Sequence, residues 1–180
     1  MLDEPLPIEA DIRKLAVKQA HFKSRFAAQH LSRFAAATEN DEAAVQVDFQ
    51  LGLDEQRRYQ LVGKVSCETS VICQRCLDTM PLQLDCDVNI IVVYDDIQAK
   101  QLPKAIEPLV VSDGELVDLN EIVEDELLLN MPFTSFHDNE NCYAKSQQFL
   151  DPNASEPEPE QADEKDNPFS VLQALKKDES

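Results

Sequence analysis

The sequence predicts a small α+β domain, because alternating strand-like segments are followed by one amphipathic helix. Three successive segments between Val45 and Tyr94 carry apolar residues at every second position, which is the period of strands with one buried face. The connections between them are short, so we expect an antiparallel meander. The overall prediction is an antiparallel sheet of about four strands, packed by one helix and preceded by a helical arm.

The chain has 180 residues, enough for one core domain with flanking segments. Residues 1–40 are predicted to form the N-terminal helical arm and residues 41–145 the α+β core. Residues 146–166 offer little apolar surface to bury, so they are predicted to be a disordered acidic linker. Residues 167–180 are predicted to form a short C-terminal helix. That helix would dock in a groove of its own domain or of a partner.

The N-terminal arm is predicted to begin its first helix at Asp11, a favourable N-cap. A second short helix is expected over residues 28–37. The apolar residues that share one face of the first helix are Ile12, Leu15, Phe22 and Phe26.

Within the core, a fourth short strand is expected at Leu109–Val111. A helix should then begin at Asp118, with Glu121 as the acid of its first turn, and should end before Pro132. The residues expected to face the sheet are Leu119, Ile122, Val123 and Leu127. The acids expected to face water are Glu121, Glu124, Asp125 and Glu126.

The formal net charge of -19, from 35 acids and 16 bases, disfavours non-specific binding of phosphate backbones. One short stretch departs from this balance, because Asp11 is its only acid. Its bases are Arg13, Lys14, Lys18, Lys23, Arg25 and Arg33. This stretch is either an RNA contact or an ordinary polar helix face that balances an acidic domain.

The apolar runs are too short for a membrane helix, and the acidic N-terminus does not fit a secretory signal. The odd number of cysteines, 5, favours reduced thiols or a metal site in the cytoplasm over a disulfide framework.

Cys73 and Cys76 form a C-x-x-C motif at the hairpin between two predicted strands, which is half of a tetrahedral zinc site. His137 and Cys142 would supply the other half if their segment folds back over the hairpin. The alternative is a pair of ordinary loop thiols. Cys67 and Cys86 are in phase with buried neighbours and are expected to be core residues.

No pattern of catalytic residues is evident, and the sequence lacks the phosphate-binding and nucleophile motifs of common enzymes. The acids Glu121, Glu124 and Asp125 are interpreted as a solvated face or as a surface for a basic protein. A metal-dependent role for them is the less favoured alternative.

Several segments, taken in order, resemble the YceD family, the large ribosomal RNA subunit accumulation proteins of bacteria. The segments that carry the resemblance are 73–76, 106–109, 118–119, 123–126, His137 with Cys142, and the closing residues 167–169, 171–172 and 175–176. The resemblance implies a cytoplasmic role in the synthesis, processing or stability of 23S rRNA, and it supplies no catalytic residue.

From the charge and the resemblance together, we predict a non-enzymatic factor that acts mainly by contacting a ribosomal protein or assembly factor. Zinc is a possible cofactor, and no membrane or small-molecule substrate is expected. One alternative is direct RNA binding through the N-terminal bases. The other is a metal-dependent RNA-processing enzyme.

Overall fold

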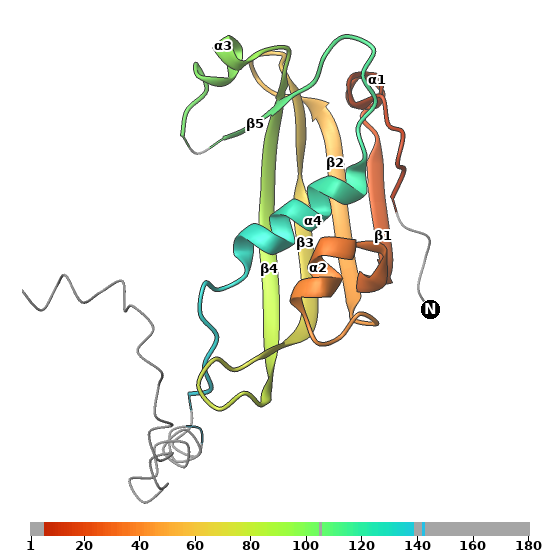
Figure 1. Ribbon diagram of the computed structural model, residues 1–180. Coiled ribbons are helices and arrows are strands. Elements are labelled where there is room, and N and C mark those ends of the chain that lie inside the picture. The colour runs from red at the N-terminus through yellow and green to blue at the C-terminus, as the bar shows by residue number, and fades with distance from the viewer. Residues whose placement is uncertain (1–5, 105, 139–141, 143–180) are drawn as a thin grey trace, which may run out of the picture.

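The computed structural model of the protein describes residues 6–104, 106–138 and 142. It contains a 5-stranded sheet in the order β1-β2-β3-β4-β5, and helix α4 lies across one face with α2 beside it (Figure 1). The strands are β1 His21–Ala27, β2 Ala44–Leu53, β3 Tyr59–Ile72, β4 Thr79–Val93 and β5 Glu107–Val110. The helices are α1 Ile12–Val17, η1 Ala28–His30, α2 Ser32–Ala37, α3 Asp96–Ala99 and α4 Leu119–Asn130. The predicted α+β class is confirmed. The sheet has five strands where about four were expected, and it is antiparallel except for the β4–β5 pair.

Strands β2, β3 and β4 form the predicted antiparallel meander. Alternate side chains along them are buried, among them Val45, Phe49, Leu61 and Val65, each with a relative exposure of 2% or less. Most side chains in the opposite phase of the same strands are polar, with Val62, Ile91 and Val93 among the exceptions. The period of the sequence therefore places the apolar core between the sheet and α4.

The prediction of one helix from Asp11 through Phe26 was wrong beyond its first turns. Asp11 does cap α1, because its carboxylate accepts the backbone N–H of Lys14 at 3.0 Å. The chain then turns at Gln19, whose φ is 52°, and β1 pairs antiparallel with β2. Phe22 and Phe26 are four positions apart, so the same pair fits one face of a helix and one face of a strand. The sheet consequently has an additional edge strand at its N-terminal end.

The predicted strand at Leu109–Val111 exists, although its pairing differs from the rest of the sheet. Strand β5 pairs parallel with β4, with Ile91 opposite Pro108. The connection between them contains α3, and a crossover of this kind is what parallel neighbours need.

Helix α4 begins where the sequence predicts, with the Asp118 carboxylate accepting the backbone N–H of Asn120 at 2.8 Å. The four apolar residues expected to face the sheet are buried. The prediction that all four acids face water was wrong for Glu124 and Glu126, which are 5% and 8% exposed. Helix α2 packs against α4 at Glu124, so α4 is covered both by the sheet and by α2.

The predicted linker 146–166 and the C-terminal helix predicted at 167–180 lie outside the described residues. Among the helices that are described, none is long and apolar enough to cross a membrane.

Candidate metal centre

The C-x-x-C motif occupies the tight turn between the two longest strands, β3 and β4. The backbone N–H of Leu77 donates to the Cys73 carbonyl, and the N–H of Cys73 donates to the Asp78 carbonyl, both at 2.9 Å. Leu77 adopts a φ of 60°, which is uncommon for a residue with a side chain. These bonds curl the turn so that the Cys73 and Cys76 side chains share one side of it, and both are buried.

The segment after α4 returns to this turn and brings the other two predicted ligands with it. The backbone N–H of Gln74 donates to the Ser135 carbonyl at 2.8 Å, which fixes the segment against the hairpin. His137 Nδ1 then lies 3.4 Å from Cys76 Sγ, and Cys142 Sγ lies 3.5 Å from Cys73 Sγ. The structure therefore joins the two halves that the sequence could only place on separate segments.

The spacing of these four atoms fits a tetrahedral metal ion. The four ligand atoms all lie within 4.8 Å of one another. In a tetrahedral zinc site two sulfurs lie about 3.8 Å apart, and a sulfur and an imidazole nitrogen about 3.6 Å, as zinc bond lengths require. The observed 3.5 Å and 3.4 Å separations are close to these values. The cluster could hold a metal with a Cys₃His donor set.

The backbone around Cys73 favours a thiolate, the form that binds metal. Burial opposes ionisation, but backbone N–H groups of Cys76, Arg75 and His137 together lower the pKa of the Cys73 thiol to about 5. The pKa of Cys142 is raised by burial and by hydrogen bonds to the other two thiols. Arg75 places its guanidinium 4.0 Å from Cys142 Sγ, where its charge offsets that of thiolate ligands.

The two remaining cysteines lie in the main core, as the sequence predicts. Cys67 and Cys86 are 2% and 3% exposed, and burial is the first cause that raises the pKa of each to about 11. They are inert packing residues in strands β3 and β4.

Comparison with known proteins assigns the chain to a family. Residues 61–176 match the family model described as "Large ribosomal RNA subunit accumulation protein YceD". A protein of that name from Haemophilus influenzae is 32% identical over 171 residues, covering 95% of this chain and 96% of that protein. The chain belongs to the YceD family. No solved structure matches this YceD-family chain.

The bases that the sequence grouped together are separated by the fold of this YceD-family protein. Arg13 donates to the Ser112 carbonyl at 3.0 Å and to the Val111 carbonyl, so it ties α1 to the segment after β5. Lys14 pairs with Asp11 at 2.8 Å. Lys18 is exposed at the end of α1.

Lys23 and Arg25 instead lie on the outer face of the sheet, as exposed residues of β1. Asp48 of β2 pairs with Lys23 at 3.1 Å and with His21 at 2.6 Å. These pairs, led by the bond from His21, lower the pKa of Asp48. A shallow hollow of about 590 Å³ lies here, and Lys64 of β3 adds a third base to its lining.

The three acids considered as a partner surface also have different surroundings. Glu121 and Asp125 are exposed on α4. Glu124 is buried, and its two oxygens accept the backbone N–H of Arg33 at 2.6 Å, that of Phe34 at 3.2 Å and the Arg33 Nε–H at 2.7 Å. The Glu124 carboxylate therefore binds α2. It is not exposed to a partner, unlike Glu121 and Asp125.

Several exposed apolar side chains of the β3–β4 turn, the end of α4 and the segment between α4 and His137 were missed by the sequence reasoning. They are Leu77, Leu129, Phe133 and Phe136, which are 67%, 73%, 98% and 40% exposed; we call this set the apolar tip. Arg75 lies over the Phe136 ring at 5.0 Å and orients it. The signal available was two phenylalanines in the short segment between Pro132 and His137.

Proposed function

We propose that this protein is a non-enzymatic cytoplasmic factor that supports the accumulation of 23S rRNA. The relationship to the Haemophilus influenzae protein carries the proposal, because the alignment extends over 95% of this chain and includes both the sheet and the metal centre. On this view the protein acts mainly by contacting a ribosomal protein or another assembly factor.

The apolar tip supports the contact with a protein. Large apolar side chains exposed on neighbouring segments are typical of binding surfaces. Phe133 is 98% exposed, so almost none of its surface is covered by the rest of the protein. Exposed acids of α4 such as Asp125 lie on the same helix as Leu129, so a basic protein with an apolar patch would complement this surface.

We further propose that the Cys₃His cluster binds zinc and that the ion has a structural role. Four protein ligands would complete a tetrahedral shell and leave no position for substrate. Bound zinc would hold the segment that carries Phe133 and Phe136 against the β3–β4 hairpin. Elemental analysis of the purified protein should find about one zinc per chain, as one four-ligand site requires.

The proposed role in cells is tested by deleting the gene and measuring the ratio of 23S to 16S rRNA. We expect the ratio to fall and to be restored by the wild-type gene. The double variant Phe133→Ser with Phe136→Ser should restore it poorly, whereas Ile97→Ser should restore it fully. Ile97 is a matched control because it is 71% exposed in α3 and lies away from the tip. An unchanged ratio in the deletion strain would contradict the proposal.

The protein contact is tested separately by capture from a lysate treated with ribonuclease. A protein partner should remain bound to the wild type and be lost from the double phenylalanine variant. If all captured material disappears with ribonuclease, the preference for protein contacts is wrong.

A further inference from the structure

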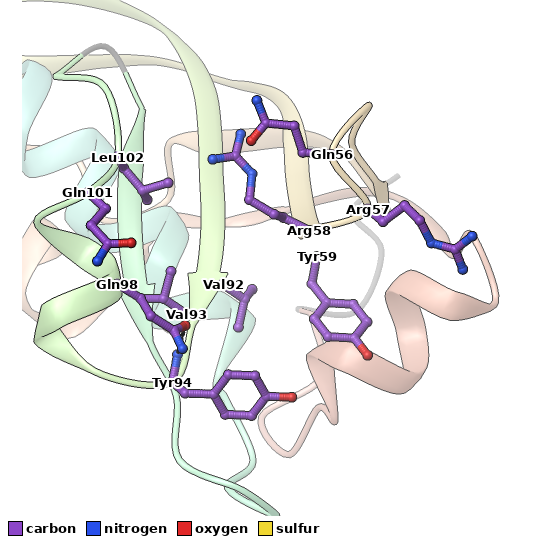
Figure 2. A pocket seen from close by; sticks show the side chains of 10 residues that line it. All are labelled: Gln56, Arg57, Arg58, Tyr59, Val92, Val93, Tyr94, Gln98, Gln101 and Leu102. Atoms are coloured by element: carbon purple, nitrogen blue, oxygen red, sulfur yellow. Dashed lines mark hydrogen bonds between the residues drawn. The ribbon is translucent and has the colours of Figure 1, made fainter.

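A second hollow lies at the end of the sheet opposite the metal centre. It has a volume of about 430 Å³ and is bordered by the β2–β3 turn, the end of β4 and the segment that begins with α3. Figure 2 shows the rings of Tyr59 and Tyr94 at one end of this hollow and Gln98 and Gln101 along one side. The side chains that line it are therefore aromatic, amide and basic rather than simply apolar.

The Tyr94 ring is fixed before any ligand arrives. The guanidinium of Arg13 lies 4.0 Å from the centroid of the ring and is itself held by backbone carbonyls. The backbone N–H of Tyr94 donates to Gln98 Oε1 at 3.1 Å, which leaves the amide NH₂ of Gln98 to donate elsewhere. Tyr94 as a residue is 48% exposed, so part of it remains open to a ligand.

Basic side chains extend this hollow along α1. A smaller hollow of about 240 Å³ shares Tyr59 with the first and is lined by Arg13, Lys14, Val17 and Lys18. Arg57 in the β2–β3 turn is exposed and also lines the first hollow. Tyr59 lines both hollows, so the two adjoin one another.

We infer that this surface binds single-stranded RNA. An unstacked base would lie against Tyr94 and Tyr59, with glutamine amides at its edge, and the neighbouring phosphates would contact Lys18 and Arg57. This inference rests on the proposed function, because large-subunit rRNA is the polymer that the protein would meet. Recognition of a duplex is disfavoured, since its bases are stacked and unavailable to the tyrosines.

The hollow on the outer face of the sheet is the natural comparison. It is larger and also basic, but none of its lining residues is aromatic, and Asp48 pairs with Lys23 within it. It can attract phosphate by charge alone. Only the hollow that contains the tyrosines could therefore stack a base. The charge reversal Arg25→Glu on the outer face of the sheet serves as the control for the charge reversal Lys18→Glu.

The test is fluorescence anisotropy of the full-length protein with a labelled single-stranded oligoribonucleotide of about 12 nucleotides in about 50 mM salt. We expect binding by the wild type that weakens steeply as salt rises, because the acidic remainder of the chain adds nothing to attraction. Tyr94→Leu, Lys18→Glu and Arg57→Glu should each weaken binding by about tenfold or more. Arg25→Glu should stay within about twofold of the wild type, as a surface remote from the contact requires.

Three results would overturn the inference. They are no binding by the wild type, equal binding by Tyr94→Leu with an unchanged melting curve, and equal loss from Arg25→Glu and Lys18→Glu. Duplex RNA that competes for the protein as well as unlabelled single-stranded RNA does would also contradict the inference. The proposed function is judged separately, because the rRNA ratio in the deletion strain and the ribonuclease-resistant capture do not depend on these variants.

Discussion

Glu124 shows how one buried carboxylate organises the contact between two helices. Helix α2 has no side-chain cap of its own, because Leu31 occupies its N-cap position. The Glu124 carboxylate, brought by α4, accepts two of the N–H groups that a helix start leaves unsatisfied. It also forms a pair with Arg33 at 2.7 Å. Removing the carboxylate would leave these N–H groups, of which that of Phe34 is buried, without their acceptor.

Replacing Glu124 with Ala should therefore destabilise the protein by about 2–4 kcal/mol, the range for losing one partner of a buried, hydrogen-bonded charge. Asp125→Ala is the matched control, because Asp125 also pairs with Arg33, at 2.9 Å, but its side chain is 58% exposed. It should cost about 0.5 kcal/mol or less. Urea unfolding of both variants measures the difference. Equal losses of unfolding free energy in the two variants would show that the bonds from Glu124 to the start of α2 contribute no more than an exposed ion pair.

Glu126 should make stability depend on pH near neutrality. Burial first, and then its hydrogen bond and repulsion with Glu107, raise the pKa of Glu126 to about 7 from 4.5. The folded state therefore holds a proton that the unfolded state releases at lower pH. This contribution to stability is complete below about pH 4.5 and is lost as pH rises through about 7.

We expect Glu126→Gln to remove much of this dependence, because glutamine does not titrate. As the pH rises from 5 to 8, the free energy of unfolding of the variant should increase relative to that of the wild type. The pKa shift of Glu126 corresponds to a difference of about 2 kcal/mol over this range. Unfolding in urea across this range provides the measurement. Glu121→Gln, an exposed change on the same helix, should leave the slope intact. Parallel stability profiles for Glu126→Gln and the wild type would contradict the assignment.

At the level of elements, the sequence predicted most of the fold because burial is one-sided in β2, β3 and β4. Strand β1 was not predicted, because the half-buried Ser24 interrupts the alternation of apolar residues between Phe22 and Phe26. The burial of two acids of α4 was not predicted, because the local sequence of α4 carries no signal that α2 packs on a second side of that helix. The four metal ligands were predictable from residue type, but their contact depends on a segment more than sixty residues away along the chain.

The pairing of β2 with β3 should be sensitive to one glycine. A Cβ at Gly63 would collide with the backbone carbonyl of Asp48, whereas a Cβ at Gly52 would meet nothing within 4 Å. Gly63→Ala should therefore destabilise the protein by about 2 kcal/mol or more, since backbone must move. Gly52→Ala should be neutral or slightly stabilising. Thermal melting compares them, and equal melting temperatures would refute the collision.

At the scale of the whole molecule, the apolar side chains of the described residues pack in two separate clusters. The larger contains the inner face of the sheet, α4 and residues from Leu6 onward. The buried members of the smaller, within the same described part of the chain, are Cys73, Cys76 and Cys142, with Met80 packed against them. Such a small cluster buries too little apolar surface to hold the returning segment by itself. The metal end should depend on its ion, and the sheet should not.

Removal of the metal should therefore loosen one end of the molecule and leave the other folded. In the presence of a strong chelator we expect the far-UV circular dichroism of the sheet to persist. A protease should begin to cut in the segment after α4, near Phe133, because its attachment to the hairpin depends on the ligands. Cys76→Ser should reproduce this cleavage without chelator. Cys67→Ser, buried in the main core, should lower the melting temperature and leave the protease pattern unchanged. If chelation unfolds the whole sheet, or if cleavage near Phe133 is the same with and without metal, the two clusters do not fold independently of each other.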